Sequence, residues 1–212
     1  MYKNYLKRVL DFTAAFIGLV LLSPVFILLT VLLGIANKGK PFFTQDRPGF
    51  NAHVFYVLKF RTMNNNTDKS GNLLPDHERL TALGSFIRKT SLDEIPQLIN
   101  IIKGDMSLIG PRPLRTFYLP FYTKREQKRH HVRPGITGLA QISGRNFIDW
   151  DQRFAYDITY VDNLSFSLDL KIFYKTILKV IRGSDVSISN ENVIDNFDVY
   201  RQKQIDSGKV TL

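Results

Sequence analysis

Residues 91–105 read SLDEIPQLINIIKGD and continue through 106–109 into the segment GPRP at 110–113. Four apolar side chains recur at helical spacing within this stretch: Ile95, Leu98, Ile99 and Ile102. This pattern predicts an amphipathic helix that is buried on one side. Lys103 and Gly104 fit its end, because a cation is favourable at a helix C-terminus and glycine readily takes the left-handed cap.

The start of this helix carries two competing signals. Ser91 and Glu94 have the spacing of a capping box, which places Asp93 in the first turn. Pro96 opposes a helix that begins at Leu92, because proline lacks the backbone donor that the helix needs there. The expected start can therefore shift by a residue or two.

Asp93 and Glu94 admit two interpretations. Acidic residues in a first turn commonly do no more than cap the helix and complement its dipole. Alternatively, they perform separate tasks, since adjacent helical side chains point about 100° apart and cannot easily share one proton. One carboxylate then attacks a substrate while the other binds a metal ion. Arg112, held between two prolines, supports this second interpretation because its guanidinium is a pre-set fork for phosphate.

These residues resemble a known family. The run 91–100, the turn KGDMS at 103–107 and the segment at 110–113 are similar to motifs of the bacterial sugar transferases, in particular the small monotopic polyprenyl-phosphate phosphoglycosyl transferases. The resemblance extends from the KRxxD start at 7–11 to the helix near Arg182. It implies an enzyme that moves a sugar 1-phosphate from a UDP-sugar to a polyprenyl phosphate such as undecaprenyl phosphate, releasing UMP, in the first membrane step of bacterial glycoconjugate synthesis.

The resemblance also implies roles for individual residues. Asp93 matches the nucleophile that forms an aspartyl-phosphosugar intermediate, and Glu94 matches the ligand of a Mg²⁺ cofactor. Lys59, in the KFRTM motif, together with Arg88 and Arg112, matches cations that bind substrate phosphates; Arg88 can alternatively complement a helix dipole. Two other readings stay open: direct transfer in a ternary complex with Asp93 as a base, and a membrane-tethered basic module with no catalytic activity.

Three further residues are expected to support the site. Asp157 borders the apolar stripe of a helix expected over 150–161, so it needs a buried cationic partner. An ion pair is the plain interpretation, and the family pattern leaves open whether Asp157 holds a metal or positions an arginine. Gln141 and Arg145, in and after the loop RPGITGLAQ at 133–141, match the family as supporting residues.

Composition limits the partners. The chain has 212 residues and a formal net charge of +10, which indicates an anionic partner: nucleic acid, acidic membrane or phosphorylated substrate. The family resemblance favours phosphorylated substrates and inner-membrane lipid over nucleic acid, and a homo-oligomer stays compatible with it. The absence of cysteine excludes disulfides and thiolate–metal sites.

The uncharged segment 12–36 predicts contact with a membrane. Hydropathy alone favours one transmembrane helix, but Ser23-Pro24 interrupts the segment and leaves halves too short to span a bilayer. Basic residues also flank both ends, so both flanks prefer the cytoplasm. We therefore expect a re-entrant helix in the bacterial cytoplasmic membrane, broken at Ser23 and Pro24, with Ser23 bonding the carbonyl that the proline leaves free.

The expected fold is α+β, mostly helical with a small β-sheet. Residues 1–37 form the anchor, 38–183 the cytosolic catalytic domain and 184–212 a loosely ordered polar tail. Strands are expected at 41–45 and 54–63, and a helix ending near Arg88 precedes the motif. A charged, exposed helix is expected over 123–131, and a basic amphipathic helix over 169–182.

Overall fold

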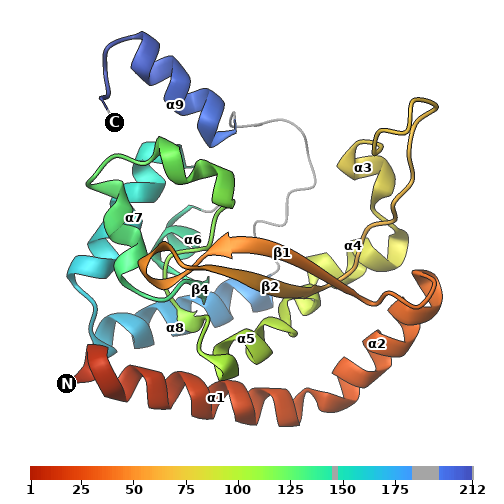
Figure 1. The fold of residues 1–212 in the computed structure, drawn as a ribbon. Helices are drawn as coiled ribbons and strands as arrows, with labels where there is room; N and C mark the ends of the chain where they lie inside the picture. The colour runs from red at the N-terminus through yellow and green to blue at the C-terminus, as the bar shows by residue number, and fades with distance from the viewer. Residues whose placement is uncertain (145–147, 183–195, 212) are drawn as a thin grey trace.

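The computed structural model describes residues 1–144, 148–182 and 196–211 (Figure 1). The helices are α1 (Lys7–Leu21), α2 (Ser23–Ala36), α3 (Asp76–Arg79), α4 (Ala82–Lys89), α5 (Gln97–Lys103), α6 (Leu139–Ser143), α7 (Trp150–Asp162), α8 (Phe166–Arg182) and α9 (Phe197–Asp206). The strands are β1 (Phe42–Pro48), β2 (Val54–Phe60), β3 (Ser107–Ile109) and β4 (Gly135–Thr137). Tighter or wider turns of helix occupy Tyr2–Leu6, Phe50–Ala52, Leu92–Glu94, Thr116–Phe121 and Glu126–His131. The predicted α+β class, mostly helical, is confirmed.

The strands pair in two small sheets within the described residues. β1 and β2 form an antiparallel hairpin, as the sequence predicts, although β1 extends to Pro48 and β2 ends at Phe60. β3 and β4 form a short parallel pair that the sequence did not indicate. The hairpin crosses the middle of the molecule in Figure 1, with the N-terminal helices below it and α9 above. The 91–113 motif contacts strand β2 of the hairpin and itself contains β3.

Helix α5 lies between α1 and the hairpin and begins later than predicted. Pro96 precedes it as the N-cap residue, where a missing N–H costs no helical hydrogen bond. The predicted buried side is largely wrong, because Leu98, Ile99 and Ile102 are only half-buried. The buried residues of α5 are instead Gln97, Asn100 and Ile101. The Asn100 amide donates to the carbonyl oxygen of Tyr56 at 2.8 Å and accepts from the backbone N–H of Leu58 at 3.0 Å. Asn100 thereby joins α5 to the backbone of β2.

The N-terminal helices break at the predicted position. α1 and α2 are inclined by 64°, and in the described part of the chain no unbroken helix has the length and apolar character needed to cross a bilayer. Pro24 has no N–H for the carbonyl of Val20, and the hydroxyl of Ser23 donates to that oxygen at 2.7 Å. The predicted hydrogen bond of Ser23 is therefore confirmed.

A buried polar network fastens α1 to the rest of the protein. Lys7 donates to the carboxylate of Asp169 at 2.8 Å, and Tyr160 donates to the other oxygen of the same carboxylate at 2.8 Å. One turn further along α1, Asp11 accepts from the hydroxyl of Ser107 at 2.6 Å. Because buried charges are costly without partners, these contacts hold α1 in one register against α8 and β3.

The segment 123–131 is not the exposed helix that its charge predicts. Residues Glu126–His131 form a 3₁₀ turn in which Glu126, Arg129 and His130 are buried. Each charged side chain has a partner from a distant part of the chain: Glu126 pairs with Arg201 and Arg129 pairs with Asp157. The prediction of an exposed helix rested on charge alone. It was wrong because long-range ion pairs allow these charged side chains to be buried.

The expected loose tail is also wrong for the described residues after 195. Phe197 in α9 is fully buried in an aromatic cluster, and Arg201 is 1% exposed. The other buried members of this cluster are Leu114, Tyr118, Tyr122, Trp150 and Phe154. Trp150, Phe154, Ile158 and Val161 of α7 are all buried, which confirms the predicted apolar stripe of that helix. α9 is therefore part of the core on this side of the molecule.

Candidate active site

Asp93 and Glu94 lie in a 3₁₀ turn between α4 and α5. Ser91 takes a left-handed backbone conformation, with φ of 56°, and this turns the chain sharply after α4. The Ser91 side chain makes no capping hydrogen bond, so the predicted capping box is wrong. The two carboxylates also precede α5 instead of lying in its first turn. A non-glycine residue with positive φ stores strain of the kind that gathers at functional sites.

Glu94 is the centre of an ion cluster. Its Oε1 accepts from Lys59 Nζ at 2.7 Å and from the Arg112 guanidinium at 3.1 Å. Burial opposes ionisation of this carboxyl, but Arg112 and Lys59 outweigh burial and lower its pKa to about 2. Glu94 is therefore a carboxylate throughout the physiological pH range.

Asp93 differs from its neighbour in charge balance. Its carboxylate lies 3.8 Å from Lys59 Nζ, and its side chain is 14% exposed. Burial raises the pKa of Asp93, with Lys59 acting in the opposite direction and the Glu94 charge adding to the rise. Arg88, in the last turn of α4, acts on Asp93 electrostatically and is held by a hydrogen bond from its Nε to the Thr62 hydroxyl at 2.8 Å. Three cations favour the charged form of Asp93, but burial and the charge of Glu94 outweigh them, so the pKa of Asp93 is raised.

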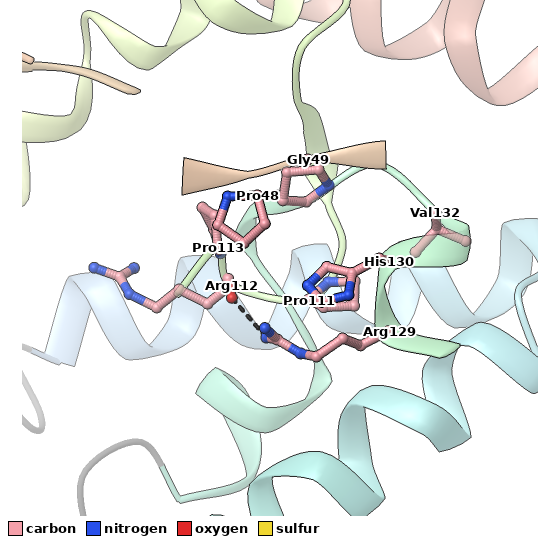
Figure 2. A pocket seen from close by; sticks show the side chains of 9 residues that line it. Pro48, Gly49, Pro111, Arg112, Pro113, Arg129, His130 and Val132 are labelled. Atoms are coloured by element: carbon pink, nitrogen blue, oxygen red, sulfur yellow. Dashed lines mark hydrogen bonds between the residues drawn. The ribbon is translucent and has the colours of Figure 1, made fainter. Parts of the chain in front are cut away.

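Arg112 is held through its backbone. Its carbonyl oxygen accepts from the Arg129 guanidinium at 2.7 Å, behind a small hollow that is also lined by Pro111 and His130 (Figure 2). Arg129 in turn pairs with Asp157 at 2.8 Å, and both side chains are at most 3% exposed. Of the two roles left open for Asp157, the contact matches the positioning of an arginine.

Gln141 and Arg145 were predicted as supporting residues of the site. Gln141 donates to the carbonyl oxygen of Ile136 at 3.0 Å, within its own loop. In the described part of the chain, Gln141 makes no hydrogen bond to Glu94 or Arg112. Arg145 lies outside the described residues. The structure therefore brings together Asp93, Glu94, Lys59, Arg88 and Arg112, and places Asp157 behind them.

The carboxylates of Asp93 and Glu94 are compatible with a site for Mg²⁺. The described residues hold no group of three or more His, Cys, Asp or Glu side chains able to bind a metal ion. Mg²⁺ is commonly bound by one or two carboxylates together with substrate phosphates and water, and Asp93 and Glu94 fit that requirement.

Sequence reasoning missed two groups near this cluster. Arg129 lies in a run of basic residues, which suggested that it is exposed to solvent. The signal for its burial was Asp157, which was predicted to need a buried cationic partner. Arg47 of β1 lines the same cavity as Lys59, Glu94 and Arg112. The first strand was expected to end at residue 45, and only its extension to Pro48 places Arg47 in the hairpin opposite Phe55.

The arrangement suits chemistry on a phosphate group. Two adjacent carboxylates, Asp93 and Glu94, meet the cations Lys59 and Arg112, which come from two other parts of the chain. Phosphoryl transfer depends mainly on positioning and on neutralising charge, and these side chains supply both.

Comparisons with known proteins agree with this reading. The family model for bacterial sugar transferases matches residues 2–183. An uncharacterized sugar transferase of Bacillus subtilis, EpsL, is 50% identical over 193 residues, covering 91% of this chain and 95% of the relative. The exopolysaccharide production protein ExoY of Sinorhizobium fredii is 41% identical over 197 residues, covering 84% of this chain and 87% of the relative.

A longer relative has a named reaction. The UDP-glucose:undecaprenyl-phosphate glucose-1-phosphate transferase of Klebsiella pneumoniae is 38% identical over 183 residues. The match covers 82% of this chain but 39% of that protein. The shared part thus corresponds to a portion of the longer enzyme.

Proposed function

Because this chain belongs to the bacterial sugar transferase family, we propose that it moves a sugar 1-phosphate from a UDP-sugar to undecaprenyl phosphate and releases UMP. The observation that carries this proposal is the placement of Asp93 beside the cluster of Glu94, Lys59 and Arg112. A non-enzymatic basic module would have no need for an under-neutralised carboxylate at such a cluster.

In the first step, an oxygen of Asp93 forms a bond to the β-phosphorus of the donor. The bond between that phosphorus and the bridging oxygen breaks, and UMP leaves with the electron pair. The product on the protein is an aspartyl-phosphosugar. The partial burial of Asp93 favours this role, because a poorly solvated carboxylate is more reactive; burial raises its pKa, and the charges of Lys59, Arg88 and Arg112 oppose that rise.

In the second step, a phosphate oxygen of undecaprenyl phosphate attacks the same phosphorus. The bond from phosphorus to Asp93 breaks, which restores the carboxylate and gives undecaprenyl diphosphate sugar. Lys59, Arg88 and Arg112 bind the non-bridging oxygens in both steps, since Lys59 and Arg112 contact the two carboxylates and Arg88 acts on Asp93 electrostatically.

Mg²⁺ is part of the proposal, with Glu94 as its protein ligand. When bound together with substrate oxygens, it neutralises the diphosphate. Glu94 is suited to hold it because its low pKa keeps the carboxylate charged. In the structure Glu94 contacts Lys59 and Arg112, so substrate binding is expected to draw these cations towards phosphate oxygens.

We further propose that α1 and α2 dip into one leaflet of the bacterial cytoplasmic membrane, with the catalytic domain on the cytosolic face. α1 has 15 residues and α2 has 14, so each reaches about 22 Å, less than the roughly 30 Å of hydrocarbon. Their bend of 64° and the Ser23 hydrogen bond favour a re-entrant path. Both helices expose large apolar side chains, including Phe16, Val20 and Ile35.

Helix α8 adds a second apolar surface. The apolar stripe of this amphipathic helix, which includes Leu170 and Phe173, points outward: Leu170 is 55% exposed and Phe173 46%, while Ile172 is fully buried against the domain. Lys171 and Lys175 are exposed beside this stripe. A basic amphipathic helix with an exposed apolar stripe suits the surface of an anionic membrane. This location brings the site to the lipid in which the acceptor is embedded.

The test is UMP release in the absence of acceptor. With purified protein, Mg²⁺ and a panel of UDP-sugars, we expect one donor to give a burst of UMP equal to the enzyme present. Asp93→Asn abolishes the burst, and the exposed Asp162→Asn, a matched control, leaves it unchanged. Mass spectrometry of the quenched protein should find the phosphosugar on a peptide that contains Asp93. UMP release that requires acceptor would instead indicate direct transfer in a ternary complex.

A further inference from the structure

Arg47 is a cation at the site to which no role has been given. It lies on β1 opposite Phe55 of β2, and Gln45 and Phe43 lie opposite Val57 and Lys59. Since directly paired residues share a face of the hairpin, Arg47 and Lys59 point to the same side. The four-residue offset between Phe55 and Lys59 places Arg47 about 13 Å from Lys59 along the strands. Both line one cavity with Glu94 and Arg112.

The repulsion of Arg47 by neighbouring cations is only partly offset, by the carboxylate of Asp46. Glu94 neutralises Lys59 and Arg112, whereas the guanidinium of Arg47 donates only to the neutral side chain of Gln45, at 2.6 Å. In the part of the chain that the structure describes, no ion pair joins Arg47 to a carboxylate. Burial and the nearby charges of Arg112 and Arg115 lower the pKa of Arg47 to about 10. A half-buried arginine among arginines is favourable when an anion lies between them.

Asp93 and Arg47 are both influenced by the charge of Arg112. Asp93 interacts electrostatically with Lys59, Arg88 and Arg112, while Arg47 interacts with Arg112 and Arg115. Arg112 is common to both sets. Asp93 lies 3.8 Å from Lys59, and one cavity is lined by Lys59, Arg112 and Arg47. A phosphate held at Lys59 and Arg112 would therefore be next to Asp93, and the cavity extends from it towards Arg47.

We propose that Arg47 binds one phosphate position that is used twice: by the α-phosphate of the UMP half in the first transfer and by the acceptor phosphate in the second. This inference rests on the proposed two-step reaction. In each step the attacking and leaving oxygens are roughly in line across the reacting phosphorus. UMP leaves opposite Asp93, and the acceptor must attack opposite the bond to Asp93. Both phosphates therefore occupy the same place, on the Arg47 side.

An arginine suits a site with two successive occupants. Its planar guanidinium offers parallel N–H groups to two phosphate oxygens, whatever the rest of the ligand is. The site then recognises the phosphate, which UMP and undecaprenyl phosphate share, and not the uridine or the prenyl chain.

The test measures binding to the full chain in nanodiscs, with UMP, uridine and undecaprenyl phosphate as probes. For the unaltered protein, undecaprenyl phosphate should displace UMP competitively. In Arg47→Gln, the Kd of UMP and that of undecaprenyl phosphate should both rise about tenfold or more, since a charged hydrogen bond is lost. The Kd of uridine should change less than twofold. Arg125→Gln, which removes an exposed arginine, is the matched control and should bind all three as before.

Two results would overturn the inference: unchanged UMP binding in Arg47→Gln, or weakening for only one of the two phosphates. If Arg47→Gln does not fold, Arg47→Lys keeps the charge without the fork, and a threefold or greater rise for both phosphates is expected. Binding needs no turnover, so this test is independent of the reaction. A chain that binds UMP through Arg47 but shows no UMP burst contradicts the proposed function, and a chain with a burst but no dependence on Arg47 contradicts only this inference.

Discussion

Arg129 joins Asp157 to the backbone of Arg112: its guanidinium lies 2.8 Å from the carboxylate and donates to the Arg112 carbonyl at 2.7 Å. Asp157 comes from α7 and Arg112 from the loop after β3, so one buried arginine fixes the position of a substrate-binding segment. The same guanidinium also donates to the Tyr122 hydroxyl at 3.2 Å. Arg112 can therefore present its side chain to Glu94 without its backbone moving.

The first prediction concerns this ion pair. Asp157→Asn leaves the charge of Arg129 buried without its counter-ion, which we expect to cost about 3–5 kcal/mol of unfolding free energy. In folded protein, kcat should fall about tenfold or more while the KM for the donor changes less, because the segment of Arg112 loses its support. Thermal unfolding and steady-state kinetics at a temperature where the variant is folded provide the measurement.

A purely structural role for the pair would give a different result. Asp157→Asn would then lower the melting temperature and leave kcat of the folded fraction unchanged. Asp157→Glu keeps the charge and should recover part of kcat, whereas Asp162→Asn, an exposed position on the same helix, should change neither quantity by much.

The second prediction concerns the path of the N-terminal helices. The chain has no cysteine, so single cysteines at Lys3 and Lys40, both exposed, can be labelled without background. A re-entrant path places both on the cytosolic face, and an impermeant thiol reagent should reach both only after the cells are opened. Labelling of one position in intact cells would indicate a spanning helix. In Pro24→Ala the carbonyl of Val20 regains an N–H donor, so we expect a measurable fraction of spanning molecules.

The third prediction concerns α9. Phe197 is fully buried among Tyr118, Tyr122, Trp150 and Phe154, so Phe197→Ala should cost about 3–5 kcal/mol of unfolding free energy. The exposed Val199→Ala on the same helix should cost under about 0.5 kcal/mol. Thermal unfolding of the two variants provides the comparison. Equal stabilities would mean that α9 does not belong to the core.

Some features were predictable because they depend on neighbouring residues. The break at Ser23-Pro24 follows from the missing N–H of proline, and the stripe of α7 follows from spacing along one helix. The buried position of Asp157 also follows from that spacing, and with it the need for a cation. Identifying the cation as Arg129 required the three-dimensional fold, since the two residues are 28 positions apart.

Other features depend on contacts that no local pattern encodes. The 3₁₀ turn at Asp93 and Glu94 exists because Ser91 turns the chain and because Lys59 and Arg112 take the Glu94 side chain that a capping box would have used. The tail was judged by its polar composition, but one buried aromatic, Phe197, and one ion pair of Arg201 outweigh that composition. Arg47 joins the site through the register of a hairpin.

The fourth prediction concerns pH and His130. This side chain is 7% exposed, and burial, together with the charge of Arg129, lowers its pKa from 6.5 to about 3. The Gln127 backbone acts weakly in the opposite direction, and the ring of Tyr122 lies edge-on at 5.3 Å. In the folded protein His130 stays neutral down to about pH 3, whereas in the unfolded chain it gains a proton below about pH 6.5. Its contribution to stability is therefore complete above pH 6.5 and is lost as the pH falls.

Between pH 7.5 and 5.5 this loss amounts to about 1.4 kcal/mol of unfolding free energy. The unaltered protein should lose that much more stability over this range than His130→Asn, in which the side chain does not titrate. For a chain of this length the difference corresponds to roughly 4 °C in melting temperature. The exposed His53→Asn should follow the pH dependence of the unaltered protein. Parallel curves for the unaltered protein and His130→Asn would mean that His130 is solvated, and that the segment holding Arg129 behind Arg112 is less tightly packed than the structure indicates.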